Sequence, residues 1–105
     1  MNDKSNWVFK DPPNMAVIAD RKIVREQDWI AHVFHDADDG GWQFHNSDLD
    51  APKLADALVV SLQEIAALDP SVAKLADLPL GWRAWPDSKG SDWQRLSILA
   101  PGRAQ

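Results

Sequence analysis

Three histidines are the side chains of this 105-residue chain best suited to acid–base or metal chemistry. His32 and His35 are three positions apart on a predicted strand, so they face opposite sides of a sheet and cannot share a metal. If a hairpin pairs His35 with Trp42, then His32 lies opposite His45, and two imidazoles on one face could contribute to a metal site. The sequence places no third ligand, so we predict packed or surface histidines and no metal or other cofactor.

The other candidate groups lack the surroundings that their chemistry requires. Asp36, Asp38 and Asp39 lie close together in the sequence, without the alternating ligands and closing glutamate of a calcium-binding loop. No serine lies in a G-x-S-x-G turn, and no glycine-rich loop could cradle a phosphate. The absence of cysteine excludes disulfides, thiolate zinc sites and cysteine nucleophiles. We therefore expect that the protein is not an enzyme.

The net negative charge comes entirely from the first half of the chain. Of the 16 acidic and 11 basic residues, residues 1–50 hold ten acidic and five basic side chains, whereas residues 51–105 hold six of each. A nucleic-acid-binding surface would have the opposite sign. The segment from Asp36 to Asp50 has no lysine or arginine, and it is either a solvated loop or a contact surface for a basic protein. For the second case the predicted contact residues are Asp36, Asp38, Asp39, Trp42, Asp48 and Asp50.

Periodicity changes from strand to helix and back along the chain. The first half predicts an antiparallel meander from about residue 15 to residue 45, with strands at 15–19, 22–24, 29–35 and 42–45. The second half has near-helical spacing of apolar residues from Leu58 to Leu68 and a Ser61–Glu64 capping box. Asp69-Pro70 then predicts the start of a second helix that buries Val72, Leu75 and Leu78. The last predicted strands are 82–85 and 93–99.

These elements predict an α+β fold, with a small, mostly antiparallel sheet and two short helices packed on one face. Residues 1–14 are expected to form an N-terminal arm or a short strand, residues 15–99 a single domain and residues 100–105 a tail. We find no apolar segment typical of a signal peptide or a membrane span, so the expected location is the cytoplasm and no membrane partner is expected.

Two stretches of the chain resemble a known bacterial family over about residues 15–96. The first is the acidic loop that ends in Gly41-Trp42-Gln43-Phe44. The second comprises Leu68-Asp69-Pro70-Ser71, Leu75-Ala76-Asp77-Leu78-Pro79-Leu80-Gly81-Trp82 and Trp93-Gln94-Arg95. Together they resemble the immunity protein 33-like family, formerly a domain of unknown function. Its pattern often has Asp-Ser-Gly-Trp at the end of the loop, where this chain has Asp39-Gly40-Gly41-Trp42.

The resemblance implies a cytosolic immunity protein (an antitoxin) that binds and blocks a cognate bacterial toxin. A basic toxin would suit the acidic segment, and binding would require a pre-formed surface and no catalytic residues. Two alternatives stay open at this point. One is a structural or interaction module that forms a homodimer through a sheet edge or exposed tryptophans. The other is a small-ligand or metal-binding enzyme, for which a deep pocket lined by His32 and His45 is expected.

Overall fold

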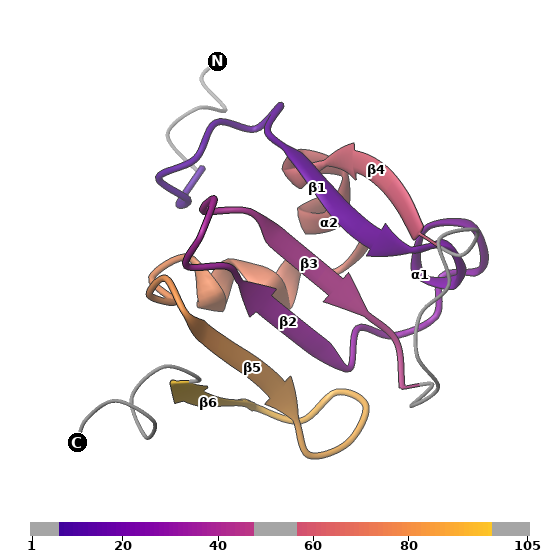
Figure 1. Cartoon of the computed structure of the whole chain (residues 1–105). Helices are drawn as coiled ribbons and strands as arrows, with labels where there is room; N and C mark the ends of the chain where they lie inside the picture. Colours follow the sequence, from indigo (N-terminus) through magenta and orange to yellow (C-terminus); the bar gives the residue numbers. More distant parts are fainter. Residues whose placement is uncertain (1–6, 48–56, 98–105) are drawn as a thin grey trace.

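The computed structural model describes residues 7–47 and 57–97, and in these residues it forms one mixed sheet with helices on one face (Figure 1). The predicted α+β class is confirmed, although a sheet of six strands in the described ranges is larger than the small sheet expected. The strands are β1 (Ala16–Asp20), β2 (His32–His35), β3 (Trp42–His45), β4 (Ala57–Ser61), β5 (Trp82–Pro86) and β6 (Trp93–Ser97). The helices are α1 (Arg21–Glu26), α2 (Leu62–Leu68) and the 3₁₀ helix η3 (Pro70–Leu75).

The strand order is β4-β1-β3-β2-β5-β6, and it differs from the predicted meander in the first half. β3 lies between β1 and β2 and runs parallel to β1, whereas the other strand pairs are antiparallel. The prediction of a return strand at 22–24 is wrong, because those residues belong to α1. Asp20 caps that helix by accepting a hydrogen bond from the Lys22 amide at 2.9 Å, and Ile23 turns into the core. The cap and this burial outweigh the strand preference of the Ile23-Val24 pair.

In the second half the predicted N-caps at Ser61 and Asp69 are confirmed, but in the described residues the Glu64 carboxylate makes no reciprocal capping bond, and one helix boundary differs. The Ser61 hydroxyl accepts a hydrogen bond from the Glu64 amide at 3.0 Å and begins α2. Leu58, which we expected in that helix, instead belongs to β4. Asp69 caps η3 by accepting hydrogen bonds from the Ser71 amide at 3.0 Å and from the Ser71 hydroxyl at 2.7 Å. The cap therefore separates two short helices within one covering layer.

The hydrophobic core lies between the sheet and this helical layer. α2 and η3 cover the face of the sheet that lies behind it in Figure 1. The sheet contributes alternate residues, as expected for strands with one buried face. The largest fully buried side chains include Val17, Val33 and Phe44 from the strands and Leu62, Ile65, Val72, Leu75 and Leu78 from the second half. The other face of the sheet, which we call the open face, has no helix over it in the described residues.

The N-terminal arm packs onto this core from residue 7 onwards and forms no strand in residues 7–14. Phe9 is 6% exposed and belongs to the core cluster. The Trp7 indole donates to the Asp11 carbonyl at 2.7 Å, which closes the arm on itself. The arm is therefore an integral part of the fold.

Replacing Asp69 with alanine should lower the free energy of unfolding by about 1 kcal/mol, because the first turn of η3 loses its side-chain acceptor. Asp69→Asn is the matched control, since its amide oxygen can still accept, and it should be close to wild type. Urea unfolding followed by circular dichroism measures both variants. Equal stabilities for the two variants would contradict a capping role.

Candidate functional site

The acidic turn, which we define as residues 36–41, joins β2 to β3 and has a fixed backbone. The Asp36 amide donates to the Gly41 carbonyl at 2.8 Å, and the Gly40 amide donates to the Asp36 carbonyl at 3.0 Å. Gly40 has a φ of 74°, a conformation that glycine adopts without steric cost. Two backbone hydrogen bonds and one left-handed residue thus close the turn.

Two of the three carboxylates in the turn are also fixed by hydrogen bonds. Asp36 accepts from the Gln43 side-chain amide at 2.9 Å, and Asp39 accepts from the Gly41 amide at 2.8 Å. Asp38 and Asp39 are exposed, and Asp36 is half-buried. The turn therefore presents negative charge in a defined geometry. The three carboxylates belong to one turn, and two of them also stabilise the turn itself.

Trp42 follows the turn but offers no surface to a partner, because it is only 2% exposed. The expectation that this indole contacts a partner is therefore wrong. Its ring stacks on His35 at a centroid distance of 3.9 Å and packs edge-on against Phe9. Its indole N–H donates to the Asp11 carboxylate at 2.9 Å. The sequence predicted Trp42 as a contact residue for a partner, whereas in the structure it connects the N-terminal arm to the start of β3, directly after the turn.

Asp11 is a residue of this region that sequence reasoning missed. It is separated from the turn by some 25 positions in the chain, and the hydrogen bond to Trp42 brings it to the same end of the sheet. The sequence signal is weak, because an aspartate directly before Pro12-Pro13 is typical of a turn or of the end of a strand. Its half-buried carboxylate adds a fourth acidic group at the end of the sheet where the turn lies.

Asp48 and Asp50 lie outside the described residues, so the structure gives no account of them as contact residues. The described part of the acidic segment ends at Ser47, which follows β3. The turn precedes β3 and Ser47 comes after it, so they are at opposite ends of this strand. The acidic turn alone is the described part of the predicted contact surface.

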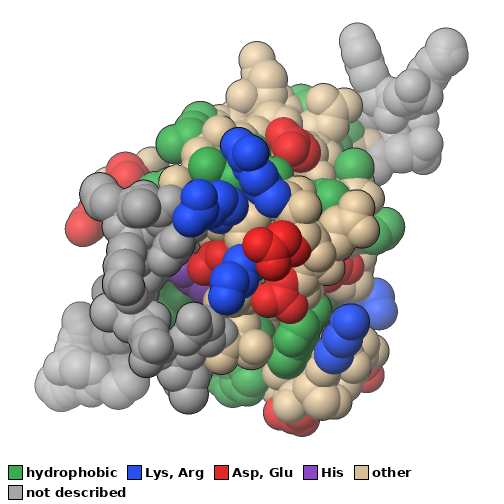
Figure 2. All heavy atoms as spheres, turned by 90° about the vertical axis from the view of Figure 1, so that its right-hand side faces the viewer, with side chains coloured by type: hydrophobic (Ala, Val, Ile, Leu, Met, Phe, Trp, Pro, Cys, Tyr) green, Lys and Arg blue, Asp and Glu red, His purple; other side chains and the backbone are tan. Residues whose placement is uncertain are grey.

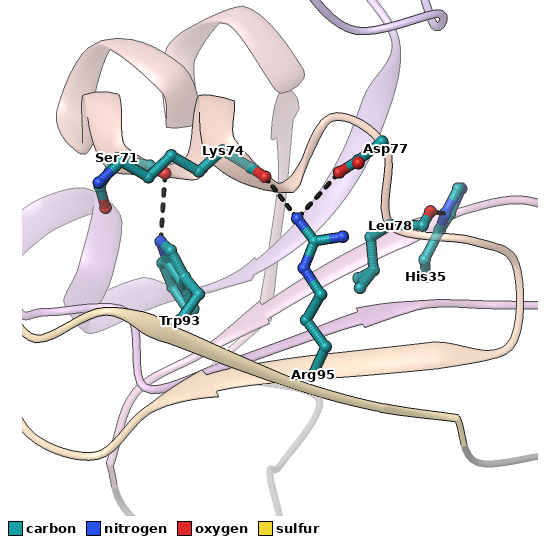
Figure 3. A network of polar contacts seen from close by, with 7 residues as sticks. All are labelled: His35, Ser71, Lys74, Asp77, Leu78, Trp93 and Arg95. Atoms are coloured by element: carbon teal, nitrogen blue, oxygen red, sulfur yellow. Dashed lines mark hydrogen bonds and ion pairs between the residues drawn. The ribbon is translucent and has the colours of Figure 1, made fainter.

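His35 also binds a second turn, residues 76–81, which connects η3 to β5. The His35 imidazole Nδ1 donates to the Leu78 carbonyl at 2.7 Å (Figure 3). The Gly81 amide donates to the His35 carbonyl at 2.7 Å. These bonds connect β2 to the segment between η3 and β5. The stacking of the same imidazole on Trp42 therefore links both turns to one ring.

Side chains of β6 bind η3 and the segment that follows it, and so connect the helical layer to the sheet (Figure 3). The Arg95 guanidinium donates to the Lys74 carbonyl at 2.7 Å and to the Asp77 carboxylate at 2.8 Å. The Trp93 indole donates to the Ser71 carbonyl at 3.1 Å. The hydrogen bond from Arg95 and its positive charge hold the pKa of Asp77 below the usual value. The charge of Asp77 is therefore largely committed to this contact.

His32 and His45 face each other across β2 and β3 on the open face, as the predicted hairpin register requires. The His45 imidazole Nε2 donates to the Gln43 side-chain oxygen at 3.1 Å, and Gln43 in turn donates to Asp36. This chain of hydrogen bonds connects the histidine pair to the acidic turn. Among the described residues, no group of three or more His, Cys, Asp or Glu side chains could hold a metal ion.

A cleft of about 350 Å³ lies elsewhere, between the segment after α1, the α2–η3 junction and the β5–β6 hairpin. Its walls include the indoles of Trp29 and Trp93 and the side chains of Lys74, Lys89 and Asp28. Its lining does not include His32 or His45, which the enzyme alternative expected to find in a pocket. The Asp28 carboxylate is already bonded to the Trp29 amide and to Asn46. This cleft is therefore not the histidine-lined pocket that the enzyme alternative expects.

The charge at the far end of the sheet contrasts with that of the acidic turn. Figure 2 views the molecule from the side of α1, and basic and acidic side chains alternate there. α1 itself contributes Arg21, Lys22 and Arg25 together with Glu26. Charges of opposite sign therefore lie side by side at the α1 end of the sheet, whereas the acidic turn contains no basic residue.

Comparison of the chain with protein-family models, with curated proteins and with solved structures found no match. Within the described residues, the helices are too short and too polar to cross a lipid bilayer.

Replacing Asp11 with alanine should lower the free energy of unfolding by about 1–3 kcal/mol, because the buried Trp42 indole N–H loses its acceptor. Lys10→Ala is the control, since Lys10 is an exposed neighbour in the same arm. Chemical denaturation of both variants tests the effect. A loss no larger for Asp11→Ala than for Lys10→Ala would contradict the role assigned to the hydrogen bond.

The histidine pair should make the fold less stable as the pH falls below about 6.5. Burial, then the Arg83 charge, lowers the pKa of His32 from 6.5. Burial also lowers the pKa of His45; the Asp20 carboxylate opposes this effect, while the His32 charge adds to it. The unfolded chain therefore binds protons at a higher pH than the folded one, and acid favours unfolding.

Unfolding free energies at pH 7.5 and pH 5.5 measure this difference. The double variant His32→Gln/His45→Gln should lose less stability between these two pH values than the wild type. His35→Gln is unsuitable as a control because His35 is bonded to Leu78. NMR titration midpoints for His32 and His45 at or above 6.5 would contradict the prediction.

Proposed function

We propose that this protein is a non-enzymatic binding protein of the immunity type, whose acidic turn occludes a basic face of a cognate bacterial toxin. The observation that supports the proposal is the fixed geometry of the turn. Asp36 and Asp39 are held by hydrogen bonds, and Asp38 and Asp39 are exposed. A surface of this kind can present negative charge without first becoming ordered.

The physical advantage of such a turn lies in its organisation before binding. Association costs free energy when loops and side chains lose conformational freedom, and a turn that is already closed avoids much of that cost. Complementary charge also accelerates encounter and disfavours partners of the wrong sign. A face rich in lysine and arginine is the partner chemistry that matches three carboxylates on a turn without a basic residue.

The proposed mechanism is occlusion, with no bond made or broken. The acidic turn lies at one end of the sheet, and Asp11 extends the negative region through its hydrogen bond to Trp42. A toxin that acts on an anionic substrate, such as a nucleic acid, needs a basic face, and the turn would cover that face. The resemblance to the immunity protein 33-like family supports the same function, and a cytoplasmic location would follow from it.

The test compares two variants with the same change in net charge at opposite ends of the sheet. Asp38→Lys/Asp39→Asn raises the net charge by three and keeps an amide oxygen at position 39 to accept from Gly41. Asp87→Lys/Asp92→Asn raises it equally in the exposed β5–β6 turn. The probe is the toxin domain encoded by the gene next to this one, and calorimetry measures its affinity for each variant.

The variant in the acidic turn should bind at least about tenfold more weakly, since close charge pairs at interfaces couple by about 1.5 kcal/mol or more. The variant in the β5–β6 turn should bind nearly as the wild type does. Equal affinity for both variants would contradict the acidic-turn mechanism. A neighbouring gene that encodes no toxin, or a toxin that the wild-type protein does not bind, would contradict the immunity function itself.

A further inference from the structure

The cleft beside the β5–β6 hairpin has no part in the proposed function, and its size suits a small molecule. The described residues that line it come from segments far apart in the sequence: 27–30 after α1, 68–74 at the α2–η3 junction and 86–93 of the hairpin. Its volume of about 350 Å³ is at the lower end of the range of about 300–1,000 Å³ that is typical of ligand sites. A ligand of about one or two rings would therefore fit.

Hydrogen bonds hold the walls of this cleft in place. The Trp93 indole donates to the Ser71 carbonyl at 3.1 Å and so connects the hairpin to η3 (Figure 3). The Asp28 carboxylate accepts from the Trp29 amide at 2.9 Å and from the Asn46 side chain at 3.1 Å. Asn46 is only 4% exposed, so this wall is anchored in the protein interior. A cleft that is formed before the ligand enters lowers the entropic cost of binding.

Two indoles supply flat apolar surface to the cleft. Trp29 and Trp93 both line it, and both are half-buried. An indole combines an apolar ring with one N–H donor. The Trp93 donor is bonded to Ser71, whereas the Trp29 indole N–H has no hydrogen-bond partner in the described part of the chain. A ligand with both apolar C–H groups and oxygen acceptors would contact both parts of Trp29.

Charges of both signs line the cleft, and this mixture disfavours a charged ligand. Lys74 and Lys89 contribute positive charge, and Asp28, Asp69 and Asp92 contribute negative charge. The aspartates would repel an anion, and the lysines would repel a cation. The side chains of Lys74, Lys89 and Asp92 make no hydrogen bond or ion pair with the described residues, so they are available to a ligand. A hydroxyl group both donates and accepts, and it can therefore bind either kind of side chain.

Gln27, which also lines the cleft, has an unusual backbone conformation. Its φ is 58°, in the left-handed region that glycine adopts without steric cost at the end of a helix. Residues other than glycine in this region are concentrated at functional sites, where the surrounding structure compensates their cost. The side-chain amide of Gln27 can both donate to and accept from a hydroxyl group. A ligand contact would explain a glutamine at a position that favours glycine.

We propose that this cleft binds a neutral polyhydroxylated ligand, namely a mono- or disaccharide. The apolar C–H groups of the sugar pack on Trp29 and Trp93, and its hydroxyl groups bond to Gln27, Lys89 and Asp92. The site is independent of the proposed function, because the cleft is not lined by any residue of the acidic turn. Loss of sugar binding and loss of toxin binding are therefore distinct experimental outcomes.

NMR spectroscopy of the full chain tests the proposal, since each of the six indole N–H groups gives its own signal. The probes are glucose, maltose, cellobiose and N,N′-diacetylchitobiose. At least one of these sugars should shift the signals of Trp29 and Trp93 saturably at millimolar concentration. The signal of Trp42, which is buried beside the acidic turn, should stay unchanged. Inorganic phosphate and choline, as an anion and a cation, should shift neither Trp29 nor Trp93.

Variants of the cleft supply the second measurement. Trp29→Leu should weaken binding of the sugar at least about tenfold, because it removes the flat ring and its donor. Trp85→Leu is the matched control, since Trp85 is a half-buried indole that does not line the cleft. Gln27→Gly should be at least as stable as the wild type, because glycine adopts the left-handed conformation freely. It should nevertheless bind the sugar about threefold to tenfold more weakly, because a hydrogen bond is lost.

Three results would overturn the proposal. The first is the absence of a saturable shift of Trp29 and Trp93 with all four sugars. The second is equal sugar affinity for Trp29→Leu and Trp85→Leu. The third is undiminished sugar binding by Gln27→Gly, which circular dichroism should show to be folded even if Trp29→Leu is not.

Discussion

The contact between Trp42, His35 and Asp11 is the interaction on which the candidate site depends. The indole is buried, stacks on the imidazole at 3.9 Å and donates to the carboxylate at 2.9 Å. Through these contacts one side chain joins the N-terminal arm, β2 and β3 at the point where the acidic turn begins. Buried polar groups must be paired, so the position of the arm and that of the turn are set together.

The contacts between Trp42, His35 and Asp11 support a turn whose backbone is already ordered before a partner binds. A flexible acidic loop would lose conformational entropy on binding, whereas the turn from Asp36 to Gly41 is already closed by backbone and side-chain hydrogen bonds. His35 extends the same support to the neighbouring turn through Leu78 and Gly81. The two faces of the sheet differ in how they are covered: α2 and η3 cover one face, and in the described residues no helix covers the other.

Local signals in the sequence were sufficient to predict some elements and not others. The caps at Ser61 and Asp69 were predictable, because a capping side chain and the amide it binds are two or three residues apart. The register that sets His32 opposite His45 followed from the length of the hairpin once its first pair was assumed. α1 was not predicted because the β-branched pair Ile23-Val24 favours a strand, and an aspartate such as Asp20 is equally typical of a turn and of a helix cap.

Long-range features could not be predicted because nothing local encodes them. The parallel pairing of β1 and β3 depends on α1 being a helix, so one local error changed the topology. The burial of Trp42 depends on Asp11 and Phe9, which reach it only after the arm has folded back. Burial of an indole in this way depends on tertiary contacts. The local sequence therefore does not distinguish a tryptophan that is exposed to a partner from one that is buried in the fold.

The account rests on negative charge that is fixed in place before a partner arrives. The most direct measurement is the association rate constant for the proposed basic toxin partner, determined over a range of ionic strength. We predict a rate that falls steeply as salt increases, because screening removes the attraction between exposed charges. An association rate that does not change with ionic strength would contradict the account.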